Sequence, residues 1–154
     1  MKSLKLIGFS IIAIFMCLSF WACSDNKEDR IQEERELIIG LWENIYFYER
    51  ATFHDGNVTE TTSTERNMTR VSYNADGTGS TFQNKDGNWT KLSEWTWTYD
   101  GITLYTYRKD TKITEEQQIN KITESELASE LHITIEHEGH PVDIYQRSVL
   151  ERVR

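Results

Sequence analysis

The sequence predicts an all-β fold, an antiparallel barrel of about eight strands preceded by a short helix. From Leu41 onward the chain is rich in Thr, Trp, Tyr, Ile and Val, which favour strands, and Pro141 is its one proline. Dipeptides that favour tight turns recur at short spacing, as in sandwiches and barrels. These dipeptides are Asp55-Gly56, Asp76-Gly77, Asp86-Gly87, Asp100-Gly101 and Glu138-Gly139.

One short helix is expected before the first strand. Ile31–Ile39 combines good helix formers with apolar residues at positions 31, 37 and 38, which predicts about two helical turns. Gly40 follows, as a glycine does at many helix C-termini. The preceding segment, residues 24–30, is polar and acidic and is expected to be a linker.

The clearest hairpin spans residues 94–107, with a two-residue loop at Asp100-Gly101. In this register the large aromatic residues of the first strand face the core together with Ile102 and Leu104, while threonines and tyrosines face away. The expected pairs are Tyr99 with Ile102, Trp97 with Leu104 and Trp95 with Thr106.

A second hairpin is predicted at residues 69–82 around Asp76-Gly77, and it places Val71 opposite Phe82. The remaining strands follow from alternation and from proline, whose missing N–H is tolerated at the start of a strand. They are expected at Val58–Arg66 (polar on both faces, so at an edge), at Leu131–Glu136 (half-buried) and from Pro141 onward.

The N-terminal segment has the layout of an export signal. Lys2 and Lys5 form a short basic head, and Leu6–Ala22 is a predominantly apolar run. Ala22 supplies the small residue that precedes a signal-peptidase cut, and Cys23 follows it. The motif Phe20-Trp21-Ala22-Cys23 resembles the lipobox of bacterial lipoproteins, in the looser form found in Bacteroidetes.

This resemblance implies that residues 1–22 are a removable signal peptide and that Cys23 carries the lipid. Residues 23–30 would then be an acidic tether and residues 31–154 the β-barrel domain. Ser24–Asp29 also resembles the Lys-plus-acidic signal that directs such lipoproteins to the outer face of the outer membrane. We therefore expect a lipid-anchored outer-membrane protein facing the cell exterior. Anchoring on the periplasmic face, an uncleaved membrane anchor and ordinary secretion are the alternatives.

Composition excludes several classes of partner and scaffold. The chain has 154 residues and a formal net charge of −8, and its predicted signal segment is basic, so the remainder is more acidic still. An acidic domain without a basic stripe repels nucleic acid and anionic membranes, so membrane residence would depend on the lipid. Both cysteines, Cys17 and Cys23, precede the barrel, which excludes a disulfide framework and a thiolate zinc cluster within it.

Gly40-Leu41-Trp42, after a short helix and at the start of the first strand, resembles the Gly-x-Trp signature of lipocalins. Asn74–Gly79 and a last strand ending in Arg-Val extend the resemblance to the short lipocalin-like domains of Bacteroidetes lipoproteins, over roughly residues 36–153. The resemblance implies that Trp42 closes one end of the barrel under an arginine of the last strand, Arg152 or else Arg147. The lipocalin disulfide is absent, and a small barrel can fill itself with side chains.

Large aromatic residues are the candidates for a ligand pocket. They could line an apolar cavity that holds a small apolar or amphipathic molecule, or form a surface platform for a sugar or lipid. The alternative is that they are simply the barrel core, since aromatic side chains dominate small β-cores. The candidates are Trp42, Tyr46, Trp95, Trp97 and Tyr99.

The sequence contains no recognisable catalytic constellation. His132, His137 and His140 offer metal-ligand chemistry, but histidines in turns are usually solvated, and we expect neither a metal nor a cofactor. There is no nucleophile elbow, no Gly-rich phosphate loop and no Ser/His/Asp arrangement in a known context, so an enzyme is not expected.

Three functions remain at this point. The first is a lipid-anchored lipocalin-like barrel that binds a small apolar or amphipathic ligand. The second is an interaction or structural surface protein with a filled barrel and an envelope protein as its partner. The third, a hydrolase or metal enzyme built on the three histidines, ranks last.

Overall fold

The computed structural model describes residues 25–154; Cys23 and the predicted signal peptide lie outside the described residues. Two compact units make up the chain, Met1–Glu33 and Glu34–Arg154, and the second contains all the strands that the structure describes. One helix, α2 (Asp25–Ile38), precedes these strands. They are β1 (Gly40–Phe53), β2 (Val58–Ser63), β3 (Thr69–Tyr73), β4 (Thr78–Lys85), β5 (Asn88–Tyr99), β6 (Thr103–Arg108), β7 (Ile113–Ile122), β8 (Glu126–His137) and β9 (His140–Arg152).

The helix is longer than the sequence predicted. It begins at Asp25, so the segment predicted as a linker is helical from that residue onward. Its Lys, Glu, Gln and Arg residues are good helix formers, and Glu28 and Asp29 favour the positive end of the helix dipole. The helix ends at Ile38, and Gly40 opens β1 with a φ of +149°. No helix in residues 25–154 is long and apolar enough to cross a membrane.

The strands form one antiparallel sheet that closes on itself. Neighbours follow chain order from β3 to β9, and β1 completes the ring by pairing with β3 on one side and with β9 on the other. β2 is an additional strand that pairs with β1 alone among the described residues, as the polar sequence of an edge strand predicted. The fold is therefore a closed eight-stranded barrel with one extra strand, and the predicted all-β, lipocalin-like fold class is confirmed.

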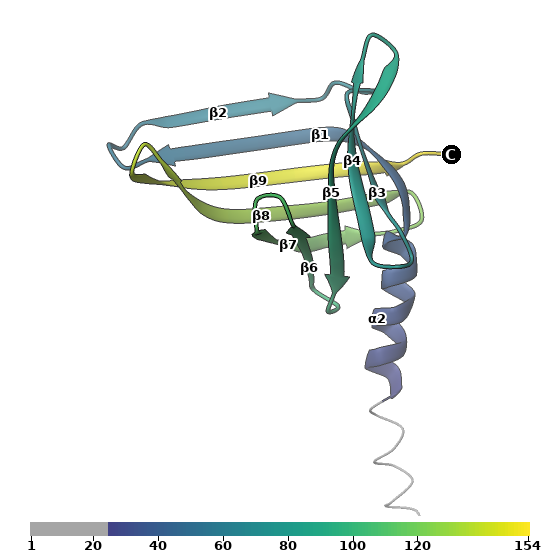
Figure 1. Ribbon diagram of the computed structural model, residues 1–154. Helices are drawn as coiled ribbons and strands as arrows, with labels where there is room; N and C mark the ends of the chain where they lie inside the picture. Colours follow the sequence, from purple (N-terminus) through teal and green to yellow (C-terminus); the bar gives the residue numbers. More distant parts are fainter. Residues whose placement is uncertain (1–24) are drawn as a thin grey trace, which may run out of the picture. The chain divides into compact units, whose positions relative to one another are not determined.

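Three strands, β1, β8 and β9, continue past the closed part of the barrel, and β2 joins them there. β1 pairs with β3 only through Gly40–Glu43, and its later residues pair with β2 instead. β8 pairs with β7 only as far as Leu131, whereas its pairing with β9 runs on to His137. The later part of β1, the first part of β9, the end of β8 and the whole of β2 thus form a four-stranded sheet (Figure 1), which we call the open half.

The hydrophobic core lies in the closed part. Its central residues come from the end of α2, from both ends of the barrel sequence and from the middle strands, so the core joins elements that are distant along the chain. They are Ile38, Trp42, Tyr73, Trp95, Trp97, Leu104, Leu127 and Leu150.

The first predicted hairpin has the right faces and the wrong pairs. Tyr99 pairs with Leu104, two residues further on than Ile102, and Trp97 pairs with Thr106. A shift of two residues keeps every side chain on its face, because strand side chains alternate with a period of two. Ile102 alone changes environment, since it belongs to the turn and is 66% exposed.

The second predicted hairpin is wrong by one residue, which changes faces. Val71 pairs with Thr81, and Phe82 pairs with Arg70, so Val71 and Phe82 point to opposite sides of the sheet. The cause is the turn: the Asn74 N–H donates to the Thr78 carbonyl at 2.8 Å, enclosing a three-residue loop in which Gly77 has a φ of +82°.

Candidate functional site

The inner side of the open half is apolar. Leu150 of β9 points into the core, and every second residue back along that strand lies on the same side as far as Val142. The pairing register shows which residues of β1 and β8 lie beside these residues of β9 on the same side of the sheet. The apolar residues among them form a surface that we call the inner apolar face. Its members are Phe47, Ala51 and Phe53 of β1, Leu131, Ile133 and Ile135 of β8, and Val142 and Ile144 of β9.

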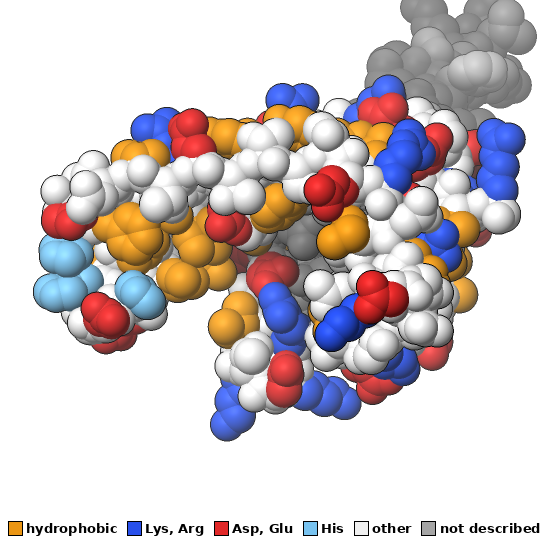
Figure 2. Space-filling view, turned by 90° about the horizontal axis from the view of Figure 1, so that it is seen from above, with side chains coloured by type: hydrophobic (Ala, Val, Ile, Leu, Met, Phe, Trp, Pro, Cys, Tyr) orange, Lys and Arg blue, Asp and Glu red, His pale blue; other side chains and the backbone are white. Residues whose placement is uncertain are grey.

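This face is incompletely covered. Ala51, Leu131 and Val142 are buried, but Phe53, Ile133 and Ile144 keep part of their surface free, as does Phe47. Ile135 is 38% exposed. Figure 2 shows hydrophobic side chains gathered beside the histidines at one end of the molecule. Because β7 leaves β8 at Leu131, the edge of β8 opposite β9 has no described strand paired with it beyond that point.

One polar pair interrupts the inner apolar face. Glu49 lies between Phe47 and Ala51 on the inward side of β1, directly across from Gln146 of β9. The Gln146 amide Nε2 donates a hydrogen bond to Glu49 Oε2 at 2.6 Å, in a partly buried position. The face therefore combines apolar surface with a carboxylate.

Further polar groups lie where the open half meets the closed barrel. Arg108 of β6 forms an ion pair with Glu115 of β7, and Ser129 donates to the Gln117 side chain at 3.2 Å. Burial, and to a lesser degree the charge of Glu115, raise the pKa of the Tyr73 hydroxyl. The Tyr73 hydroxyl therefore keeps its proton to a higher pH than an exposed tyrosine does.

The aromatic candidates from the sequence are mostly core residues. Trp42 has no exposed surface, and Trp97 and Trp95 are 2% and 8% exposed. The structure brings these three together with Tyr99, which is half-buried and donates from its hydroxyl to Glu34 at 2.9 Å. Tyr46 is separate: it pairs with Val149 across a bulge and lies on the outer side of β1.

Gly40, Trp42 and Arg152 lie together at the closed end. The Arg152 guanidinium is centred 4.3 Å from the Trp42 ring, and the indole N–H donates to the Ile38 carbonyl at 2.7 Å. A Cβ at Gly40 would come within 2.3 Å of Arg152 Nη1, so only glycine leaves room for the arginine. Arg147, the other candidate, is exposed and lies 3.9 Å from Glu130.

The three histidines do not gather at one point. His137 and His140 pair at the tip of the open half, where His140 stacks on His54 with ring centroids 3.8 Å apart. His132 lies on the side of β8 opposite to His137 and packs against Tyr145, with the two ring centroids 4.6 Å apart. The described residues contain no group of three or more His, Cys, Asp or Glu side chains suited to a metal ion.

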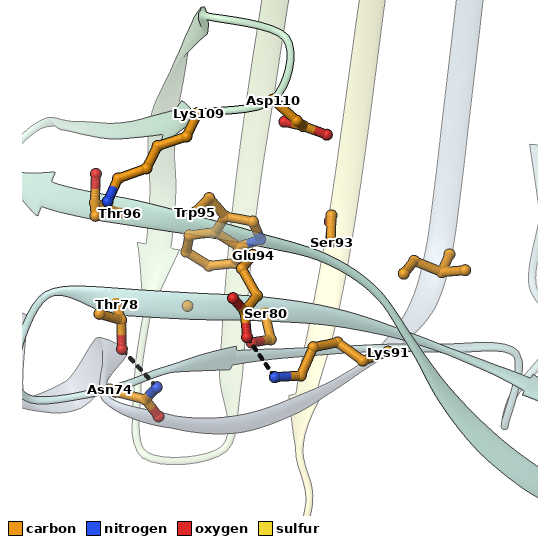
Figure 3. Close-up of a pocket in the computed structure, with 12 residues that line it drawn as sticks. Asn74, Thr78, Ser80, Lys91, Ser93, Glu94, Trp95, Thr96, Lys109 and Asp110 are labelled. Atoms are coloured by element: carbon orange, nitrogen blue, oxygen red, sulfur yellow. Dashed lines mark hydrogen bonds and ion pairs between the residues drawn. The ribbon is translucent and has the colours of Figure 1, made fainter.

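A groove of about 610 Å³ with a mixed lining lies between the β3–β4 turn, β5 and the β6–β7 turn. Two pairs of its polar side chains contact each other: Lys91 is paired with Glu94, and the Asn74 amide donates to the Thr78 hydroxyl at 2.9 Å (Figure 3). Trp95 borders the groove, but its ring packs against Gly79 and Tyr73. Leu92, which is 59% exposed, also lines the groove, so the groove has some free apolar surface.

Sequence reasoning did not identify the inner apolar face as a site. The alternation of Leu131, Ile133 and Ile135 was recognised as a half-buried strand, but nothing in it shows that β7 ends its pairing at Leu131. A usable signal was the unequal length of the strands: β1, β8 and β9 are much longer than β3 and β6.

The fold and this face define a lipocalin-like barrel with an open, apolar inner side. No protein-family model and no curated protein matches the chain. Among solved structures, it is similar to a lipocalin-like protein from Bacteroides uniformis, with 15% identity and a TM-score of 0.45 over 76% of this chain and 99% of that one. An S-type phycobiliprotein lyase from Guillardia theta has 12% identity and a TM-score of 0.46, over 83% and 97% of the two chains. A redesigned β-barrel has 12% identity and a TM-score of 0.36, over 79% and 96%.

Proposed function

We propose that this protein is a lipid-anchored envelope lipoprotein whose lipocalin-like barrel binds a small apolar or amphipathic ligand on the inner apolar face. The observation that supports this function is the free surface of Phe53, Ile135 and Ile144 on the inward side of the open half. Apolar surface that continues a barrel interior and remains uncovered is typical of ligand sites. Binding rather than catalysis is proposed, since this face carries apolar side chains and one carboxylate.

The expected affinity is modest. Burial contributes about 0.8 kcal/mol for each methylene removed from water. A ligand with ten buried methylenes would gain about 8 kcal/mol against an association cost of at least about 4 kcal/mol. This difference of at most about 4 kcal/mol corresponds to a dissociation constant of roughly 1 mM.

A neutral fluorescent probe tests the binding site. N-phenyl-1-naphthylamine should bind the wild-type protein with a rise in fluorescence, and Ile135→Glu should weaken binding at least tenfold, because it places a charge within the inner apolar face. Ile102→Glu is the matched control, since Ile102 is more exposed than Ile135 but lies in the β5–β6 turn. Equal binding by both variants, or none by the wild type, would contradict the proposed site.

The alternative is a non-enzymatic interaction or structural surface protein with a filled barrel and no ligand. The core supports this alternative, because Trp42, Trp97 and Leu104 fill the closed part. Native mass spectrometry of protein extracted from its own membrane distinguishes the two functions. A small molecule that repeatedly co-purifies favours ligand binding, and repeated absence favours the filled barrel.

Anchoring is the second part of the proposal. It is motivated by the sequence Phe20-Trp21-Ala22-Cys23. In the native host, we expect an acylated mature protein that begins at Cys23 and that protease reaches on intact cells. Cys23→Ser should abolish incorporation of labelled palmitate. Labelled variant protein would contradict anchoring at this cysteine, and protection from protease would favour the periplasmic face.

A further inference from the structure

We propose that the ligand of the inner apolar face carries a protonated amine, which Glu49 binds; this inference rests on the proposed ligand-binding function. Glu49 is the only carboxylate on the inward side of the open half within residues 25–154, and that side carries no lysine or arginine. A carboxylate at this position would favour amphipathic molecules with a cationic head group over those with a neutral or anionic one.

Glu49 has no cationic partner among the described residues. Its carboxylate accepts a hydrogen bond from the neutral Gln146 amide at 2.6 Å, and none of the ion pairs in residues 25–154 includes it. Other half-buried carboxylates of the barrel are neutralised, as Glu115 is by Arg108 and Glu43 by Arg70. Glu49 differs from these carboxylates in having a neutral hydrogen-bond donor beside it in place of an arginine.

The neighbours of Glu49 on the inner apolar face are uncharged. Phe47 and Ala51 flank it on the same side of β1, and Leu131 lies beyond Gln146 on β8. A partly buried carboxylate in apolar surroundings is stabilised by an opposite charge, which these neighbours do not supply. A ligand ammonium group would supply it, and the apolar tail of the ligand would exclude water from the ion pair.

The distance from Glu49 to the tip of the open half fits a tail of medium length. Phe53 lies four positions beyond Glu49 on β1, which is roughly 13 Å at about 3.3 Å per residue. Phe53, Ile135 and Val142 surround that end of the face, and Ile133 and Ile144 lie between it and the carboxylate. A straight alkyl chain of about ten carbons covers this distance with its amine at Glu49.

Three probes of equal chain length test the inference at pH 7: decylamine, decanol and decanoate. By calorimetry, with each probe below its micelle concentration, the wild-type protein should bind decylamine at least tenfold more tightly than decanoate, with decanol between them. Added NaCl should reduce the preference for the amine, because the ion pair is partly screened.

Glu49→Gln should remove the preference for decylamine and leave decanol binding unchanged. Glu136→Gln is the control: it removes the same charge from the outer side of β8 and should keep the preference. Circular dichroism checks that both variants fold. If Glu49→Gln does not fold, the effect of NaCl on the wild-type preference for decylamine tests the inference instead.

The outcomes separate the two proposals. If all three probes bind the wild type equally, or decanoate binds best, the amine inference is wrong while the ligand-binding function stands. If none of the three binds, the proposed function itself fails, and the amine inference fails with it. A loss of preference in both variants would assign the effect to net charge and would contradict a role for Glu49.

Discussion

Arg152 lies over the indole ring of Trp42, with its guanidinium centred 4.3 Å away, and the two residues are paired across β1 and β9. The same guanidinium donates hydrogen bonds to the carbonyls of Leu37, Ile39 and Glu124, with Ile39 at 2.8 Å. The Arg152 side chain therefore packs on Trp42 of β1, donates hydrogen bonds to carbonyls at the end of α2, and binds the turn between β7 and β8.

Replacing Arg152 should cost about 3 kcal/mol in the free energy of unfolding. Arg152→Met keeps much of the side-chain volume but removes the cation over the ring and leaves carbonyls without a donor. Urea unfolding followed by tryptophan fluorescence measures the effect. Arg154→Met, an exposed arginine two residues further on, should change stability by less than about 0.5 kcal/mol. Equal effects of the two substitutions would contradict the role given to Arg152.

Gly40→Ala should destabilise the barrel by about 2 kcal/mol. The substitution adds a Cβ 2.3 Å from Arg152 Nη1 at a residue whose φ is +149°. In an Arg152→Ala background the steric part disappears, so the cost should fall to about 1 kcal/mol. Gly56→Ala is the control for backbone conformation alone, because its φ is +84° and nothing lies within 4 Å of its Cβ position. Additive costs in the double variant would show that the arginine is not the obstacle.

Gly79→Ala should displace the Trp95 ring. A Cβ at Gly79 would lie 2.1 Å from Trp95 Cζ3, and that ring also packs edge-on against Tyr73 at a centroid distance of 4.9 Å. Overpacking of this kind costs about 1–3 kcal/mol. The variant should unfold at a lower urea concentration and show an altered near-UV circular dichroism spectrum. An unchanged midpoint and spectrum would mean that the β4–β5 pair adjusts freely.

Acid should weaken the fold partly through the turn carboxylates. Hydrogen bonds from the backbone N–H groups of Thr103 and Ile102 hold the pKa of Asp100 below its usual range, and the Thr78 hydroxyl and N–H do so for Asp76. A carboxyl whose pKa is lower in the folded state stabilises the fold above its unfolded pKa of about 3.9. That contribution is lost as the pH falls through the folded value.

Asp100→Asn tests this pH dependence. The variant should be less stable than the wild type at pH 7, and the difference should shrink below about pH 4, because the wild-type carboxyl is then protonated. Urea midpoints measured between pH 7 and pH 2 give the comparison. A difference that stays constant across this range would contradict the assigned hydrogen bonds.

Local patterns were enough to predict several of the strands, whereas β7 was not predicted and the closed end was expected from the resemblance to lipocalins. Tyr99, Trp97 and Leu104 lie on the expected face, because an error of two residues preserves alternation. Phe82 lies on the unexpected face, because the β3–β4 turn has three residues in its loop rather than two. An Asp-Gly dipeptide marks a turn without fixing its length, so register could not be derived from it.

The inner apolar face depends on pairing that local patterns do not contain. Ile133 and Ile144 are partners across β8 and β9, and Ala51 joins them from a strand far away in sequence. The face is left partly exposed because β3 stops pairing with β1 at Glu43 and β7 stops pairing with β8 at Leu131. Where these pairings end depends on the whole barrel. The buried tryptophans were visible as candidates because their size and alternation are local features.

The most direct test of the account is to observe where an apolar ligand binds. Decanol, which is neutral, can be titrated into protein labelled at the isoleucine δ-methyl groups and followed by NMR. We predict saturable shifts at Ile133, Ile135 and Ile144, with Ile102 and Ile38 unchanged. Shifts confined to other isoleucines, or none at all, would contradict a ligand site on the inner apolar face.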